Sequence, residues 1–250
     1  MNISSLNNGK KLNIDKKEIY HYLGYHFGGE VPLDDELEKM VDDLTSKMKE
    51  VITPRCAYEM YSLRVKDDIC SLNRYSCNAL DQTSLDANEN PDDNSEPLLV
   101  IKSAKLSAHI KECRFAILFA ATIGPGADML IRRFSGRSTI KPAILQAVGA
   151  AAIEAFADDM TESIKQELSC SGFANSPAET SDSMVSVTAK EPDDSVRFKM
   201  RFSPGYGDFS LNHQNDFFKL LQLEKNLGMS LNSALLMSPS KSITAVIGVL

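Results

Sequence analysis

The feature that most constrains the fold is a long apolar segment, residues 139–168, which predicts the longest helix of the chain. Its apolar residues recur at helical spacing and are mostly small, so another element can pack closely against them. These residues are Ile144, Val148, Ala151, Ala152, Ala155, Phe156 and Met160. Glu154 lies inside this run, where a carboxylate must point outward, pair with an Arg or Lys, or bind a cationic ligand. A Glu154 that binds a ligand would lack a partner in the empty protein.

The surrounding patterns predict an α+β fold, with helices in the N-terminal and middle parts and a twisted antiparallel sheet. We expect the strands to be concentrated late in the chain. A buried strand at 115–123 should turn through Thr122-Ile-Gly-Pro-Gly126 into a helix that reaches Phe134, with Pro125 near its start. The other predicted elements are helices at 15–23, 33–51, 103–113 and 210–223, strands at 57–65, 98–101 and 197–201, and a hairpin of 231–237 with 242–249 closed by 238–241.

The chain divides into three predicted segments. Residues 1–66 form an N-terminal helical segment, in which residues 1–14 are expected to be frayed and Asp15 caps the first helix. Residues 67–97 are expected to be a polar surface loop. Residues 98–250 are expected to be the core, with a disordered insertion at 171–194.

If residues 171–194 are disordered, they should be dispensable for the stability of the protein. Residues 171–194 are rich in Ser, Asp, Glu and Pro, and bury too little apolar area to offset the entropy cost of ordering them. Deleting them should therefore leave the melting temperature nearly unchanged. A loss of several degrees in a thermal melt would show instead that the segment packs on the body.

Composition excludes several classes of protein. The 43% hydrophobic and 24% charged content is typical of a soluble globular protein. A net charge of −7 disfavours nucleic acid or an anionic membrane as the main partner. We expect no membrane span and no signal peptide, because the longest apolar run, 115–123, is about half of the roughly 20 residues that a span needs. Five cysteines without a C-x-x-C pair indicate reduced thiols and a cytoplasmic protein.

The chemistry-bearing candidate is the segment 201–208, Arg-Phe-Ser-Pro-Gly-Tyr-Gly-Asp. Pro204 presets its own φ, and Gly205 permits a positive φ or a close approach of the backbone to a ligand. Arg201 offers a planar donor fork that suits a carboxylate. The simpler alternative is a strand that runs into a Pro-Gly turn, with Arg201 in a surface ion pair. No metal site is expected, because His21 and His26 lie poorly on one helix face and lack a further ligand.

Several motifs in one order resemble the activation domain of cobalamin-dependent methionine synthase. They are Arg-x-x-Pro-Gly-Tyr at 201–206, a helix rich in Phe and Leu, and a Met-x-Pro-x-x-Ser-x-Thr motif at 237–244. A weaker likeness reaches back to Ile153-Glu154-Ala155-Phe156-Ala157, which is similar to the family's Ala-Glu-Ala-Phe-Ala. The likeness covers about fifty residues well.

The resemblance implies a binding function. Family members bind S-adenosylmethionine and cap a cobalamin domain, so that a cofactor oxidised to cob(II)alamin is reductively methylated. It implies that Arg201 binds the methionine carboxylate, Glu154 the ammonium group, the backbone of Ser203 and Gly205 the adenosine, and that Tyr206 lines the cleft towards the corrin. The implied partners are a cobalamin-binding methionine synthase or related corrinoid protein, and an electron donor such as flavodoxin or ferredoxin.

The departures from the family pattern define the alternatives. The cobalamin-binding signature Asp-x-His-x-x-Gly is absent, so we expect a stand-alone subunit that acts on a separate protein. The family's C-terminal Tyr-Tyr ligand contact has no counterpart before Leu250, and its acidic N-terminal contact does not align with residues 1–60. One alternative is therefore a docking module for a corrinoid protein that does not bind S-adenosylmethionine. An ordinary methyltransferase is disfavoured, because the Rossmann glycine loop is missing.

Overall fold

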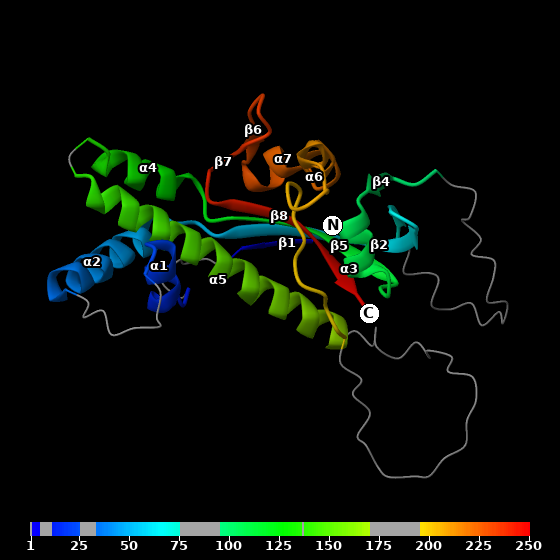
Figure 1. Cartoon of the computed structure of the whole chain (residues 1–250), viewed down its shortest axis with the longest axis horizontal. Helices are drawn as coiled ribbons and strands as arrows, with labels where there is room; N and C mark the ends of the chain where they lie inside the picture. Colours follow the sequence, from blue (N-terminus) through cyan, green and yellow to red (C-terminus); the bar gives the residue numbers. More distant parts are fainter. Residues whose placement is uncertain (1, 6–11, 26–33, 76–95, 137, 171–195) are drawn as a thin grey trace, which may run out of the picture.

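One antiparallel sheet organises the protein, with helices on both of its faces (Figure 1). The structure is a computed structural model, which describes residues 2–5, 12–25, 34–75, 96–136, 138–170 and 196–250. The main path of the sheet is β4-β3-β2-β5-β8, and β1 pairs with β2 beside it. The strands are β1 (Asn2–Ser5), β2 (Arg55–Lys66), β3 (Ile69–Arg74), β4 (Leu99–Lys102), β5 (Phe115–Thr122) and β8 (Ser242–Val249).

The strand β5, between β2 and β8, is buried on both faces because its side chains alternate between two apolar cores. Ile117, Phe119 and Ala121 enter the first core. The residues between them, such as Leu118, enter the second. A continuous apolar run therefore forms a strand here without the alternation of a half-exposed sheet.

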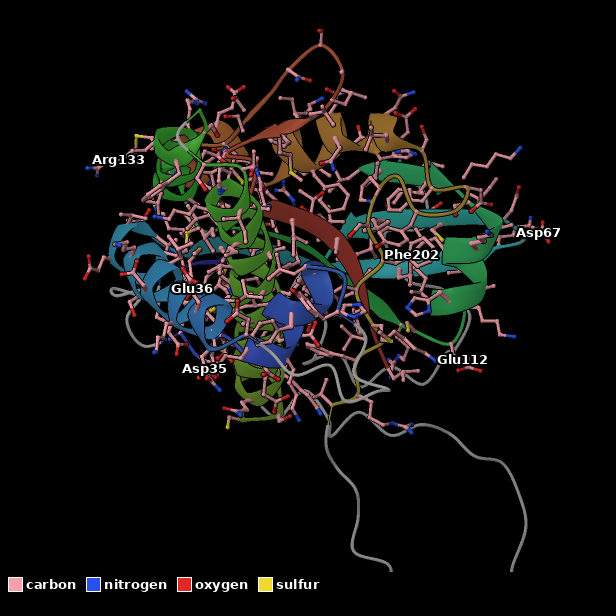
Figure 2. The ribbon with its side chains drawn as sticks, turned by 60° about the vertical axis from the view of Figure 1, so that its left-hand side comes forward. Asp35, Glu36, Asp67, Glu112, Arg133 and Phe202 are labelled. Carbon is pink, nitrogen blue, oxygen red and sulfur yellow. The ribbon has the colours of Figure 1, made fainter. Side chains whose placement is uncertain are left out.

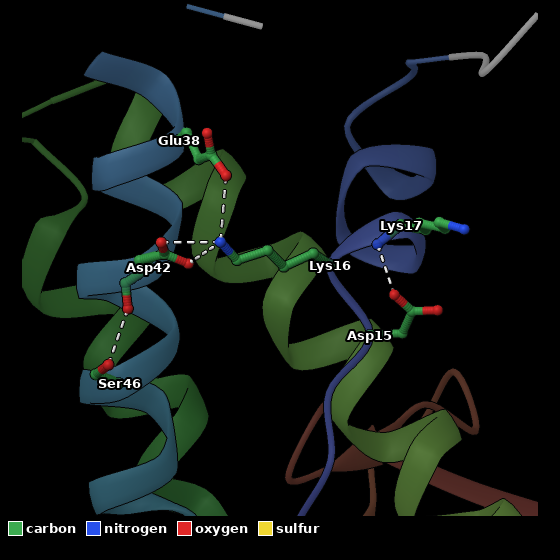
Figure 3. Close-up of polar contacts among 6 residues, drawn as sticks. All are labelled: Asp15, Lys16, Lys17, Glu38, Asp42 and Ser46. Carbon is green, nitrogen blue, oxygen red and sulfur yellow. Dashed lines mark hydrogen bonds and ion pairs between the residues drawn. The ribbon is translucent and has the colours of Figure 1, made fainter. Parts of the chain in front are cut away.

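Four helices cover the first core: α1 (Lys16–Tyr22), α2 (Asp35–Val51), α4 (Pro125–Phe134) and α5 (Ile140–Cys170). Figure 1 shows α5 running obliquely across the sheet, with α1, α2 and α4 beside it. The Lys16 ammonium joins α1 to α2 through Asp42, at 2.6 Å, and Glu38, at 3.4 Å (Figure 3). These groups are exposed, so the pairs contribute little and the apolar contacts hold the helices together.

The second core lies under the opposite helices, which are short. They are α3 (Ala104–Ile110), the 3₁₀ turn η4 (Leu211–His213), α6 (Gln214–Leu220) and α7 (Leu223–Leu227). A small hairpin of β6 (Ser230–Leu231) and β7 (Met237–Ser238) follows them. Its chain then enters β8, which pairs with β5 along its whole length.

The structure confirms the elements that local signals predict. Asp15 caps α1 by accepting a hydrogen bond from the Lys17 amide at 2.9 Å, as Figure 3 shows. Pro125 opens α4 after Gly124, whose φ is +82°. The α+β class is confirmed, and α2, α3, α5, β2, β4 and β5 lie within a few residues of their predicted positions.

Three expectations that depend on distant pairing are wrong. Residues 1–14 are not simply frayed, since β1 pairs with β2 and the side chains of Leu12 and Ile14 are buried in the first core. The polar loop at 67–97 begins with a strand, β3, which pairs with both β2 and β4. The strands are also not concentrated late, because β2 to β5 all precede α5.

The predicted C-terminal hairpin is wrong in its partners. β8 pairs with β5 rather than with residues 231–237, and β7 pairs with β6. The side chains of β8 enter the same two cores as those of β5, so pairing with β5 buries this apolar strand on both faces. The predicted strand 197–201 forms only isolated bridges with β8, at Phe198–Val249 and Phe202–Val246.

The insertion 171–194 lies outside the described residues. The division into three segments stays a prediction, although β2 of the first segment pairs with β5 of the third.

Among the described residues, α5 alone is long and apolar enough to cross a membrane by length and composition. A buried core helix meets the same test, and the apolar residues of α5 pack in the first core.

Candidate functional site

The segment 201–208 is held beside the edge strand β8. Phe202 exchanges two backbone hydrogen bonds with Val246, each 2.9 Å long. The chain then turns at Pro204, and the Gly205 amide donates to the Phe209 carbonyl at 2.8 Å with φ at +96°. Figure 2 shows Phe202 between β8 and α3, and its ring lies 5.6 Å from that of His109. The predicted turn is confirmed, including the positive φ at Gly205.

Asp208 fixes the far end of this segment on the start of α3. Its carboxylate accepts hydrogen bonds from the Ser103 hydroxyl, at 2.5 Å, and from the Ala104 amide, at 2.8 Å. These bonds, with a weaker one from the Lys105 amide, hold the pKa of Asp208 below its ordinary value of 3.8. Asp208 is thus a structural residue that positions the turn.

We expect Asp208 to make stability depend on acid pH. Its folded pKa lies below the unfolded one, so its contribution is present above about pH 4 and is lost as the pH falls through the folded pKa. Asp208→Asn should therefore lower the melting temperature at pH 7, and the difference from wild type should shrink as the pH falls from 5 towards 3. Thermal melts across this range provide the check. A difference that stays constant down to pH 3 would contradict the assignment.

Arg201 lies against one face of α5. Its Nη2 donates to Glu154 Oε2 at 2.9 Å, and its Nη1 donates to Asp158 Oδ1 at 2.7 Å. Glu154 and Asp158 are four residues apart, so both carboxylates project from the same face of the helix. The Arg201 side chain is 18% exposed, against 46% for Glu154 and 71% for Asp158. The guanidinium is therefore enclosed, while its two acceptors remain open to solvent.

These groups line a groove of about 600 Å³ between α5, the segment 198–206 and β8. This is within the range of small-molecule sites, roughly 300–1,000 Å³. The lining includes Glu154, Asp158, Thr161, Arg201, Ser203, Tyr206, Gln214, Ser242 and Thr244. One side of the groove carries an ion-pair cluster, formed by Arg201 with Glu154 and Asp158 of α5. Its other side carries neutral polar groups of β8 and α6.

Four of the five predicted site residues line the groove: Glu154, Arg201, Ser203 and Tyr206. Gly205 does not line it but forms the turn below Tyr206. Tyr206 is 68% exposed, so it borders the opening rather than filling the interior. The ligand roles of these residues stay predictions.

The structure also brings in residues that sequence reasoning missed. Asp158 carries a usable signal, since it follows Glu154 by one helical turn. Thr244 ends the motif at 237–244, but nothing in the sequence connects it with Gln214, because the two are 30 residues apart and meet only through the fold. A ligand role for Glu154 implies a carboxylate without a partner in the empty protein, but Glu154 instead pairs with Arg201.

A metal role for this region finds no support in the described ranges, which contain no group of three or more His, Cys, Asp and Glu residues placed to hold an ion. His26 of the sequence-level candidate lies outside the described residues.

The comparisons with known proteins agree with this architecture. A family model described as the activation domain of vitamin B12-dependent methionine synthase matches residues 35–249. Among solved structures, the MetH reactivation domain bound to AdoHcy matches with a TM-score of 0.65 and 16% identity, covering 99% of this chain and 78% of that chain. At this identity the likeness shows the fold alone. No curated protein matches the chain.

Proposed function

The chain belongs to the family of activation domains of vitamin B12-dependent methionine synthase, and from this premise we propose that its groove binds S-adenosylmethionine for the methylation of a partner's corrinoid. The observation that carries the proposal is the grouping of a guanidinium and two carboxylates at one side of a groove of ligand size. The related MetH domain was crystallised with AdoHcy, the demethylated form of this ligand, in its structure.

The ion-pair cluster suits the amino-acid end of the ligand. Arg201 would turn its donor fork from the α5 carboxylates to the ligand carboxylate, while Glu154 would accept hydrogen bonds from the ligand ammonium group. The exchange gives Arg201 and Glu154 one partner each, because a zwitterion supplies both charges, and it leaves Asp158, which is 71% exposed, to solvent. A ligand with a carboxylate but no ammonium group would draw Arg201 away and leave Glu154 without a partner, and this favours an α-amino acid moiety.

The rest of the groove would hold the nucleoside. Ser203 and Pro204 line it where the chain turns away from Arg201, and Thr244 lines it from β8. Tyr206 borders the opening, where an incoming partner would meet the ligand. These residues bind and orient. None of them needs to act as an acid or a base, since S-adenosylmethionine supplies the methyl group.

The family implies a cobalamin-binding partner. We propose that this chain acts as a separate subunit on a methionine synthase or related corrinoid protein in the cytoplasm. Reductive methylation takes one electron and the methyl group, converting cob(II)alamin to methylcobalamin and leaving S-adenosylhomocysteine in the groove. A flavodoxin or ferredoxin would supply the electron.

A second function, docking to a corrinoid protein without a ligand, has one observation in its favour. Arg201, Glu154 and Asp158 already satisfy one another, so the groove needs no ligand to compensate its charges. The exposed side chains of Met200 and Tyr206 beside it would then serve a protein surface.

Isothermal titration of the full chain with S-adenosylmethionine separates the two functions. The proposal predicts binding at one site per chain and competition by S-adenosylhomocysteine. An absence of binding would favour the docking function. Methyl transfer would then be followed with methyl-labelled S-adenosylmethionine, a cob(II)alamin-loaded methionine synthase and a reducing partner, with label expected in methylcobalamin only when this chain is added.

A further inference from the structure

Gln214, the first residue of α6, presents a carboxamide to the groove from a nearly buried position. The residue is 3% exposed, yet it lines the groove. Its Oε1 accepts a hydrogen bond from the Thr244 hydroxyl at 2.9 Å, and Thr244 is itself only 2% exposed. Because the threonine bonds to Oε1, the amide nitrogen is the part of the carboxamide that is left to bond elsewhere.

The amide nitrogen of Gln214 has no hydrogen-bond partner within the described part of the chain. It is not among the fully enclosed polar atoms without a partner, because it opens on the groove. A buried donor left without an acceptor is costly, so such a group is typical of a place where a ligand or water accepts the bond. The free donor thus belongs to a residue that lines the proposed ligand site.

The position of Gln214 matches the nucleoside end of the ligand. Arg201 and the α5 carboxylates take the amino-acid end. The antiparallel bridge between Phe202 and Val246 leads the following residue, Ser203, back along β8 towards Thr244. The Gln214–Thr244 pair therefore lies nearer the start of β8 than the ion-pair cluster does. This is the direction in which the nucleoside of the proposed ligand would extend.

We infer that Gln214 recognises the base of the bound nucleoside and selects adenine. This inference rests on the proposed function. The amide nitrogen would donate to a ring nitrogen of the base, and the second lone pair of Oε1 would accept from the exocyclic amino group beside it. Adenine offers this acceptor and donor side by side, and a glutamine amide matches them with two bonds.

The same geometry rejects hypoxanthine. In hypoxanthine a carbonyl oxygen replaces the exocyclic amino group. This oxygen and Oε1 are both acceptors, so they would face each other with no proton between them. Polar sites discriminate strongly against analogues that leave buried groups unpaired. Thr244 is a positioning residue in this scheme, since it touches the amide and not the base.

The test compares S-adenosylhomocysteine with S-inosylhomocysteine by titration calorimetry of the full chain. Wild type should bind the adenosyl compound at least about fivefold more tightly. In Gln214→Leu this preference should disappear, and in Thr244→Val it should decrease. Gln146→Leu, a change at an exposed glutamine on α5, is the matched control and should keep the wild-type ratio. The ratio is measured on one preparation, so partial unfolding cancels.

Gln214→Glu covers the case in which the leucine variant does not fold. The carboxylate still accepts from Thr244 but cannot donate to the base, so it too should lose the adenine preference. Equal wild-type affinities for the two compounds, or a preference kept by the Gln214 variants, would overturn the inference and leave the proposed function standing. Failure of wild type to bind either compound would overturn both.

Discussion

Replacing Arg201 with alanine should weaken S-adenosylmethionine binding by about 1.5–3 kcal/mol, or roughly ten- to 150-fold. Arg201 is the enclosed member of the ion-pair cluster, with Glu154 and Asp158 as its acceptors. Its removal deletes the donor fork for the ligand carboxylate and leaves two negative charges that repel that carboxylate. Titration calorimetry measures the loss.

The fold should tolerate this change. Glu154 is 46% exposed and Asp158 71% exposed, so water solvates them once Arg201 is gone, and the unfolding free energy should change by less than about 1 kcal/mol. Lys199→Ala is the matched control, because Lys199 lines the same groove but pairs with Glu112 at 3.1 Å. If Arg201→Ala binds as wild type does while remaining folded, Arg201 has no ligand role.

Glu154→Gln should weaken S-adenosylmethionine binding by about tenfold and slow the reactivation of a cob(II)alamin-loaded synthase. The amide still accepts a hydrogen bond but no longer offers a negative charge to the ligand ammonium group, and charged partners make the stronger bonds. The structure sets the stability expectation. Because Arg201 keeps Asp158 and Glu154 is half exposed, the unfolding free energy should change by less than about 1 kcal/mol.

Asp158→Asn is the natural comparison, since it removes the negative charge from the other acceptor of Arg201, at 2.7 Å. A specific ammonium contact at Glu154 predicts that Glu154→Gln has the larger effect on affinity. Denaturant midpoints and affinities should be taken from the same preparations. A loss of a few kcal/mol in stability with undiminished affinity per folded molecule would make Glu154 a structural ion-pair residue.

The sequence predicts what local physical chemistry determines. Asp15, Pro125 and the periodicity of α2 mark helix ends and faces within a few residues, and the Pro204-Gly205 pair marks a turn. Strand pairing is different, because β1 and β3 are short and become strands only beside β2. The sequence likewise does not predict which strand pairs with β8, since an apolar strand can pair with any other.

The candidate site shows the same division. A motif identified Arg201, and an apolar helical run made Glu154 conspicuous, but neither signal says that the two are in contact across 47 residues. Gln214 is an ordinary polar residue at a helix start until the fold buries it against Thr244. Contacts of this kind depend on the assembled sheet, so they follow from tertiary structure and not from local pattern.

The double role of β8 has a consequence for how the protein matures during synthesis. One edge of β8 completes the sheet against β5, while its other edge carries the bridges to Phe198 and Phe202 that hold the Arg201 segment. On the ribosome, β1 to β5 can therefore assemble well before the groove exists, because the groove needs residues 242–249 to have emerged. Ligand binding would thus report completed folding of a nascent chain, and a translational stall ahead of β8 would leave β5 with an unpaired, apolar edge.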